Sequence, residues 1–221
     1  MLPLQTVATA QVGGRAFVLA RRGDEWLVRV DGHVLMSSRQ HGSEESLATE
    51  ALSRVAKPGH VLIGGLGLGY TLRAVLDRVG EETRVHVAEL VPELVDWNRA
   101  HLGALNGQAL SDARVQVYVG DVGPLLRRSA ARFDAILLDV DNGPVALSQA
   151  GNSELYTARG VRDCHEALRP GGVLTVWSAG PSESYERLLS QNGFEARSVR
   201  VAVTRAEKSG ARHVIFVAQR R

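Results

Sequence analysis

The sequence predicts an α/β protein: a doubly wound, mostly parallel, seven-stranded sheet preceded by a small β-rich extension. Three observations support this prediction. From residue 60 onward, short apolar segments alternate with amphipathic segments, which implies parallel strands joined by helical crossovers. The C-terminal part instead places two strand-like segments in succession, FEARSVRVAV and ARHVIFVAQ, which predicts a closing hairpin. The N-terminal part alternates apolar and polar residues without helical spacing, which predicts the extension.

The extension and a linking helix form a predicted N-terminal domain of residues 1–55. The segment RAFVLARRGDEWLVRVDGHVLMSS reads as two or three short strands, with turns at its Arg-Gly-Asp and Asp-Gly sequences. A helix is expected from about Ser43 to Val55, with Ser43 as N-cap and glutamates in the first turn. A Lys-Pro-Gly sequence then interrupts the chain, so the second domain is expected to span residues 56–221.

The second domain contains the repeated strand–helix pattern. In a sheet of this kind, ligands bind beyond the carboxyl ends of the strands. The expected strands are HVLIGG, RVHVAEL, RVQVYVGD, FDAILLDV and GVLTVWSAG; the helices that alternate with them are YTLRAVLDRV, PELVDWNRAHLG, VGPLLRRSAAR and ELYTARGVRDCHEALR.

Composition excludes several classes of function. The 221 residues carry a net charge of +2 without a run of like charges, so neither a nucleic-acid partner nor a membrane surface is predicted. The single cysteine, Cys164, is expected to pack inside a helix, and it suits a reducing compartment. With no N-terminal apolar leader, we expect a cytoplasmic protein. The histidines and the one cysteine form no metal-ligand pattern, so no metal is expected.

A glycine-rich loop, IGGLGLGYTL, follows the first strand of the second domain and opens a helix. Gly65, Gly67 and Gly69 allow a tight turn and a close approach of a ligand to backbone N–H groups. The dinucleotide pattern G-x-G-x-x-G fails because Tyr70 stands at its last glycine, and the phosphate-binding G-x-x-x-x-G-K-[ST] pattern is absent. The loop therefore favours a ligand that lacks phosphates.

Acidic residues stand at the ends of the next three parallel strands. Glu89 follows the glycine loop at the spacing of a ribose-binding acid, and Asp121 could accept from an exocyclic amine of a purine. Asp139 and Asp141 end the fourth strand in AILLDVDNGP. Because parallel strands end at one edge of a sheet, these acids are expected near the glycine loop and predict a binding site.

The motifs GGLGLG, VAEL, VGDV and ALRPGGVL, together with the final hairpin, resemble the class I S-adenosylmethionine-dependent methyltransferase fold, which is Rossmann-like. Within that fold the chain is most similar to the spermidine synthase family, and the resemblance includes VRVDGHVL in the N-terminal part. The resemblance implies that residues 56–221 are a catalytic domain, that the acceptor is a small amine such as a polyamine, and that the protein is a homodimer.

The resemblance also implies roles for individual residues. The three loop glycines would line the adenosyl ligand, Glu89 would hold its ribose and Asp121 would face its adenine. Asp139 matches the acid that takes a proton from the attacking amine, and we expect Asp141 to support it. Gln40 and Tyr156 are expected on the substrate side.

The departures from the family leave the reaction open between methyl and aminopropyl transfer. Spermidine synthases carry an acid in the glycine loop that grips the amine of decarboxylated S-adenosylmethionine, and here that place falls on Gly67 or its neighbours. With Arg39, Gln40 and His41 expected nearby, the full methionine moiety is slightly favoured, and with it methyl transfer. We therefore expect a transferase that uses S-adenosylmethionine or its decarboxylated form. The alternative is a degenerate fold that acts as a nucleotide-binding or dimerisation module.

Overall fold

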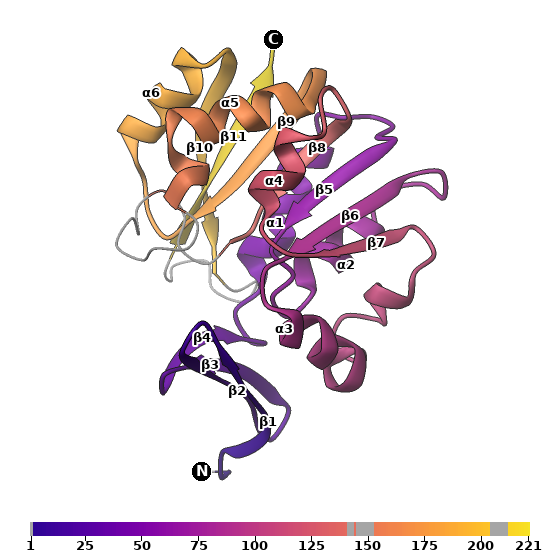
Figure 1. The fold of residues 1–221 in the computed structure, drawn as a ribbon, viewed down its shortest axis with the longest axis vertical. Coiled ribbons are helices and arrows are strands. Elements are labelled where there is room, and N and C mark those ends of the chain that lie inside the picture. The colour runs from indigo at the N-terminus through magenta and orange to yellow at the C-terminus, as the bar shows by residue number, and fades with distance from the viewer. Residues whose placement is uncertain (1, 141–143, 145–152, 204–211) are drawn as a thin grey trace.

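The predicted central sheet is present in the computed structural model, which describes residues 2–140, 144, 153–203 and 212–221. Its seven strands follow the order β10-β11-β9-β8-β5-β6-β7 (Figure 1). The five strands β5 to β9 are parallel to one another, and β11 pairs antiparallel with both β9 and β10. The α/β class, the seven strands and the closing hairpin are thus confirmed. The strands are β5 (His60–Gly64), β6 (Arg84–Glu89), β7 (Val115–Val119), β8 (Phe133–Leu138), β9 (Leu168–Ser178), β10 (Phe194–Ala202) and β11 (Arg212–Arg220).

Helices cover both faces of this sheet because alternate strand residues point to opposite sides. In β5, Val61 and Ile63 pack toward α1 and α2, whereas Leu62 packs toward α4, α5 and α6. The six α-helices of the described chain are α1 (Gly42–Leu52), α2 (Tyr70–Leu76), α3 (Pro92–Trp97), α4 (Val122–Arg127), α5 (Ala158–Ala167) and α6 (Glu183–Gln191). A π-helix (Asn98–Leu102) extends α3, and 3₁₀ turns lie at Ala109–Ser111 and Ser153–Tyr156.

The N-terminal extension is a separate four-stranded antiparallel sheet in the order β1-β2-β3-β4. It comprises β1 (Gln5–Val12), β2 (Arg15–Arg22), β3 (Glu25–Val30) and β4 (His33–Ser37), one strand more than the three predicted at most. Its apolar face, with Phe17 and Val28, packs against Leu68 of the glycine loop and Trp97 of α3. The extension therefore lies beside the glycine loop and α3, at the carboxyl edge of the central sheet (Figure 1).

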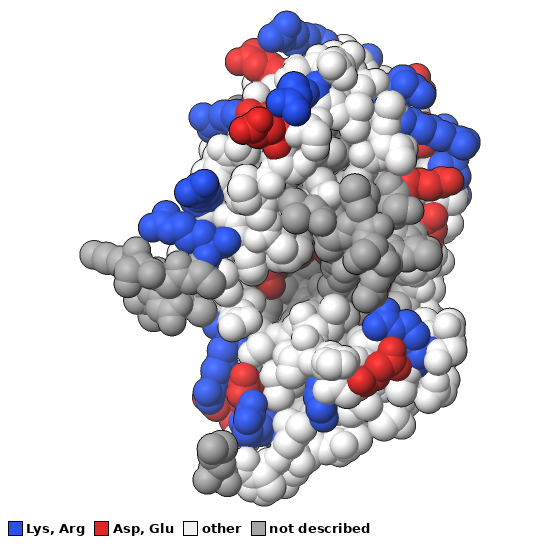
Figure 2. Space-filling model, turned by 90° about the vertical axis from the view of Figure 1, so that its left-hand side faces the viewer, with Lys and Arg blue, Asp and Glu red and all other residues white. Residues whose placement is uncertain are grey.

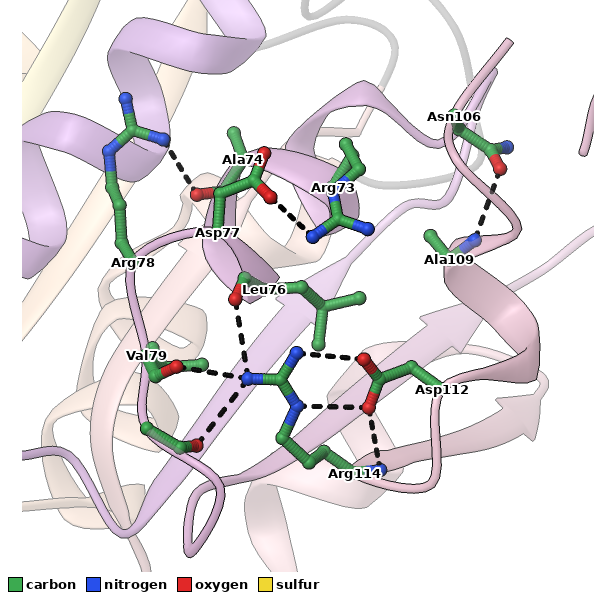
Figure 3. Close-up of polar contacts among 11 residues, drawn as sticks. Arg73, Ala74, Leu76, Asp77, Arg78, Val79, Asn106, Ala109, Asp112 and Arg114 are labelled. Atoms are coloured by element: carbon green, nitrogen blue, oxygen red, sulfur yellow. Dashed lines mark hydrogen bonds and ion pairs between the residues drawn. The ribbon is translucent and has the colours of Figure 1, made fainter. Parts of the chain in front are cut away.

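A partly buried polar cluster connects the end of α2 to the start of β7 (Figure 3). The Arg114 guanidinium donates to the carbonyl oxygens of Leu76 and Val79, at 3.3 and 2.9 Å, and forms two hydrogen bonds with the Asp112 carboxylate. These bonds satisfy carbonyl groups that the end of a helix leaves without partners. The cluster fixes the helix that begins at the glycine loop.

The linking helix begins one residue earlier than predicted and ends earlier than Val55. Residue His41 is its N-cap, and Ser43 lies inside the first turn with its hydroxyl directed to Glu44. The predicted N-cap role of Ser43 is therefore wrong. Cys164 is buried in α5, as predicted, and burial raises the pKa of its thiol to about 12.

Candidate active site

Two neighbouring cavities open at the carboxyl edge of the parallel strands. The first, of about 270 Å³, lies between α1, β4 and the ends of β8 and β9, and we call it the Glu44 cavity. The second, of about 80 Å³, lies at the ends of β5, β6 and β7, and we call it the Glu89 cavity. Both are lined by Met36, Gly67, Asp139 and Val140, so Asp139 stands at their junction. In Figure 2 a hollow with acidic atoms inside it lies above the N-terminal sheet.

The three loop glycines have different reasons to be glycine. All three have positive φ, at +92°, +52° and +86° for Gly65, Gly67 and Gly69, a conformation that other residues rarely adopt. A Cβ at Gly65 would collide with the backbone carbonyl of Asp139, and one at Gly69 would lie 2.5 Å from the Asn106 amide nitrogen. Gly65 and Gly67 line the cavities. Gly69 lines neither cavity; it is the N-cap of α2 and packs against the Asn106 side chain.

Two buried asparagines hold this loop from behind. Asn98 donates to the carbonyl oxygen of Gly67 at 2.9 Å, and Asn106 donates to that of Leu68 at 3.1 Å. The two amides also bond to each other at 2.7 Å. Asn98 begins the π-helix, a distortion that is frequent at functional sites. The pair fixes the carbonyl directions of the loop and so the surface that the loop presents to a ligand.

Glu89 is the last residue of β6 and lines the Glu89 cavity. It is 5% exposed, and its two carboxylate oxygens accept from the backbone N–H groups of Leu66 and Val91 at 2.7 and 2.8 Å. Burial raises the pKa of this carboxyl above its usual range. Each oxygen keeps a further lone pair, so the carboxylate can still accept hydrogen bonds from a pair of ligand hydroxyls.

Asp121 lies at the far wall of the same cavity. It follows β7 and is the N-cap of α4, where its side chain accepts from the N–H of Gly123 at 2.9 Å. Its side chain is exposed, so its carboxylate can receive a second donor from a ligand.

Asp139 directly follows β8, and its backbone N–H continues the sheet pairing to the carbonyl of Gly64 at 2.8 Å. One carboxylate oxygen accepts from the hydroxyl of Thr71, a buried residue of α2. Burial is the main cause that raises the pKa of Asp139 to about 6, and the neighbouring charge of Glu89 acts in the same direction. Asp139 is thus a fixed carboxylate with a proton affinity suited to general-base chemistry near neutral pH.

A second acid, Glu44 in the first turn of α1, lines the larger cavity. It accepts from the Ser43 hydroxyl at 2.7 Å, and that hydroxyl lies 3.1 Å from Nδ1 of His213 in β11. The same Nδ1 accepts from the indole N–H of Trp177 at 3.2 Å. Burial and the charge of Asp139 raise the pKa of Glu44 to about 8.

The described lining of the two cavities carries four acids and neither lysine nor arginine. Burial lowers the pKa of His213, so its ring is neutral near pH 7. The site therefore offers negative charge and apolar walls, a combination that binds cationic groups on alkyl chains. Within the described residues, no group of three or more His, Cys, Asp or Glu side chains is placed to hold a metal ion.

The sequence-family model of the spermine/spermidine synthase domain matches residues 40–201, which include the glycine loop and all four cavity acids. The chain belongs to the spermine/spermidine synthase family. It is 38% identical over 166 residues to polyamine aminopropyltransferase 2 of Pseudomonas aeruginosa, covering 71% of this chain and 45% of that protein. It is 30% identical over 160 residues to polyamine aminopropyltransferase 2 of Hyperthermus butylicus, covering 70% of this chain and 50% of that protein. The chain thus spans half or less of the length of these two relatives.

Solved structures agree on the fold of this family member. Spermidine synthase from Thermotoga maritima superposes with a TM-score of 0.80 at 19% identity, covering 98% of this chain and 73% of that chain. A spermidine synthase in complex with the transition-state analogue AdoDATO gives a TM-score of 0.83 at 18% identity, covering 98% and 74%. The resemblance inferred from the sequence motifs is therefore confirmed at the level of family and fold.

Most of the site residues predicted for this family member lie together. Gly65, Gly67, Glu89, Asp121 and Asp139 line the Glu89 cavity. On the other side of the junction, Gln40 lines the Glu44 cavity.

Four of the predicted residues, Gly69, Tyr156, Arg39 and His41, line neither cavity. Tyr156 does not line either cavity; it packs in the core, with its ring 5.9 Å from that of Tyr185. Its position gives no support to substrate contact. Asp141 lies outside the described residues. Arg39, expected near the donor, is exposed and paired with Asp24.

The sequence reasoning missed four residues that line the Glu44 cavity: Glu44, Tyr70, Trp177 and His213. The sequence indicates only that Glu44 is an acid in the first turn of the linking helix. Tyr70, noted as the residue that breaks the dinucleotide pattern, stacks on His41 with the ring centroids 4.2 Å apart. The sequence could have placed Trp177 in the site, because Trp177 lies near the end of β9 and this end lies at the same edge of the sheet as Asp139.

Proposed function

We propose that this protein is an aminopropyltransferase that moves the aminopropyl group of decarboxylated S-adenosylmethionine to a small amine. The observation that supports this best is the pair of joined cavities with acids on their walls and Asp139 at their junction. The nucleoside part of the donor would occupy the Glu89 cavity, with its ribose hydroxyls on Glu89 and its adenine toward Asp121. The acceptor amine would enter through the Glu44 cavity.

The charges of the site support the decarboxylated donor over S-adenosylmethionine. The carboxylate of S-adenosylmethionine would face buried acids, and the described lining offers it neither lysine nor arginine. The slight preference for methyl transfer rests on the missing acid in the glycine loop and on three residues expected near the donor, Gln40, His41 and Arg39. Gln40 lines the Glu44 cavity, whereas Arg39 does not. The Arg39 side chain is 63% exposed and pairs with Asp24 and Glu25, and the homologues are named aminopropyltransferases. These observations do not support methyl transfer.

The proposed reaction is an in-line displacement at carbon. The neutral acceptor nitrogen attacks the aminopropyl carbon that is bonded to the sulfonium; a C–N bond forms, the C–S bond breaks and the sulfur keeps the electron pair. The products are methylthioadenosine and a secondary ammonium, which transfers its extra proton to Asp139. The sulfonium is already a good leaving group, so the protein contributes mainly by orientation of the two reactants.

Asp139 would both orient the acceptor and receive this proton. Its backbone is fixed by the sheet pairing to Gly64 and by close packing on Gly65, and one of its carboxylate oxygens is held by Thr71. The other oxygen remains for the amine. General-base catalysis by a carboxylate held in this way contributes about 10²- to 10⁴-fold in rate.

The test is an assay of wild type and Asp139→Asn with decarboxylated S-adenosylmethionine and 1,4-diaminobutane, followed by chromatography of methylthioadenosine and the amine product. We expect both products from wild type and a loss of about 10²- to 10⁴-fold in kcat for the variant, with methylthioadenosine still bound. Binding of methylthioadenosine without any transfer would favour the alternative of a degenerate binding module. The retained acids of the site argue against that alternative.

A further inference from the structure

Tyr70 is the residue that breaks the dinucleotide pattern, and the proposed reaction gives its side chain no role. It is the first residue of α2, directly after the glycine loop. Its half-buried ring lines the Glu44 cavity. A glycine at this position would have no side chain to contact the rest of the cavity wall. The contacts that the Tyr70 side chain makes therefore indicate what this residue adds to the site.

The Tyr70 side chain contacts both ends of a linker, residues 38–41, that connects β4 to α1. Its hydroxyl donates to the carbonyl oxygen of Ser38 at 3.0 Å. Its ring stacks on the imidazole of His41, with the centroids 4.2 Å apart and the planes inclined by 13°. Burial is the main cause that raises the pKa of Tyr70 to about 12, so the hydroxyl keeps its proton and remains a donor near neutral pH. One side chain thus holds the linker at its beginning and at its end.

The two ends of this linker are fixed to different walls of the Glu44 cavity. Ser38 exchanges two hydrogen bonds of 2.9 Å with Trp26 of β3, so it is joined to the N-terminal sheet. His41 is the N-cap of α1, and its Nδ1 lies 3.1 Å from the Glu45 carboxylate. Residues of β4 and of α1 both line the cavity. The position of the linker therefore sets the separation of these two walls.

The linker also borders the place where the two reactants would meet. Gln40, in the middle of the linker, lines the Glu44 cavity together with Met36 of β4. Met36 and Asp139 line both cavities, so the wall that continues into the linker reaches their junction. A shift of this wall would change the space that is available to the carbon chain of an acceptor whose nitrogen lies at Asp139.

We propose that Tyr70 is a positioning residue that holds the 38–41 linker in place and so determines which lengths of acceptor fit the Glu44 cavity. This inference rests on the proposed function for the identity of the acceptor as an alkyl amine. Tyr70 acts through the linker and not on the reacting atoms. Loss of its contacts would let β4 move away from α1, and a longer carbon chain would then fit between them.

The experiment is calorimetry of the protein saturated with methylthioadenosine, titrated with 1,4-diaminobutane or with 1,6-diaminohexane. Tyr70→Phe removes the hydrogen bond to Ser38 and keeps the stacking on His41. We expect the ratio of the two affinities to shift toward the longer amine by at least about 3-fold, since one hydrogen bond contributes a factor of about 3 to 10. Tyr70→Leu removes both contacts and should shift the ratio further.

A general loss of stability would not change this ratio, because unfolded protein is lost equally to both amines. Tyr118→Phe is the matched control: it removes a phenol hydroxyl from β7, and Tyr118 lines neither cavity. This variant should keep the wild-type ratio. In turnover, Tyr70→Phe should raise KM for 1,4-diaminobutane with kcat changed by less than about 3-fold. Its affinity for methylthioadenosine should stay within about 3-fold of wild type.

The inference is overturned if Tyr70→Phe and Tyr70→Leu both keep the wild-type ratio, or if Tyr118→Phe shifts the ratio as much as they do. It is also overturned if Tyr70→Phe weakens methylthioadenosine binding as much as diamine binding, because Tyr70 would then act on the glycine loop. Transfer by wild type, with an unchanged ratio in both Tyr70 variants, would contradict this inference alone. A ratio that depends on Tyr70, in a protein that binds both amines without transfer, would contradict the proposed function alone.

Discussion

Glu44→Gln is expected to change how the stability of the protein depends on pH. Burial and the charge of Asp139 raise the pKa of Glu44 from 4.5, the ordinary value of a glutamate, to about 8 in the folded protein. The folded state therefore holds this proton more tightly than the unfolded state does. The contribution of Glu44 to stability is fully present below pH 4.5 and is lost as the pH rises through about 8.

The magnitude follows from this shift, because each pKa unit corresponds to about 1.4 kcal/mol. Between about pH 5 and about pH 9, the full shift would remove about 4 kcal/mol from the free energy of unfolding, and solvent screening at a partly buried group reduces this to about 2 to 4 kcal/mol. Glutamine does not titrate. The free energy of unfolding of the variant should therefore fall less steeply with pH and should exceed that of wild type at alkaline pH.

The assay is urea unfolding without ligand at a series of pH values, followed by the fluorescence of the three tryptophans. The difference between Glu44→Gln and wild type reports the titration of Glu44 together with its electrostatic interaction with Asp139, which is present in both proteins. Glu45→Gln serves as the control and should follow the wild-type profile. Parallel profiles for wild type and Glu44→Gln across the whole range would refute the account of Glu44 as a buried, unneutralised acid.

Three further predictions concern other parts of the site. The activity of wild type should fall as the pH drops through about 6, because protonation of Asp139 removes the base. The Thr71→Val variant should move the midpoint of this pH profile upward, because the hydrogen bond from Thr71 lowers the pKa of Asp139. A midpoint that does not respond to Thr71 would contradict the assignment of Asp139 as the base. Asn98→Ala should weaken methylthioadenosine binding about 10-fold in calorimetry and cost about 1 to 3 kcal/mol in urea unfolding, because the carbonyl of Gly67 loses its donor. Unchanged binding would show that the loop needs no such support. Gly65→Ala should destabilise the fold by about 1 to 2 kcal/mol, because the φ of +92° at this position disfavours a side chain. The variant should also have a lower kcat, because the new Cβ displaces the backbone of Asp139. A wild-type kcat in this variant would argue against the contact between Gly65 and Asp139.

The central sheet was predictable because its signals are local. Each parallel strand is a short apolar segment; Glu89 is the last residue of one strand, and Asp121 and Asp139 come within two residues after the ends of two others. Parallel strands bring their carboxyl ends to one edge, so position in the chain sufficed to place these acids together. The glycine loop was predictable for the same reason, since it joins the first of these strands to its helix.

The larger cavity was not predictable, because it is assembled by packing between distant elements. Nothing in the sequence GSEES distinguishes Glu44, which enters the cavity, from Glu45, which pairs with His41. The difference arises from the side of α1 that packs on α2 and on the ends of β8 and β9. Tyr156 shows the converse: a tyrosine expected at the substrate belongs to the hydrophobic core.

The most direct test of the proposed activity compares the affinities of the protein for decarboxylated S-adenosylmethionine and for S-adenosylmethionine by calorimetry. The two ligands differ only in the carboxylate, which would enter a site whose described lining carries acids without lysine or arginine. Repulsion over a few ångströms at the effective dielectric of such a site predicts at least about 10-fold tighter binding of the decarboxylated form. Equal affinities, or tighter binding of S-adenosylmethionine, would contradict aminopropyl transfer as the function of this site.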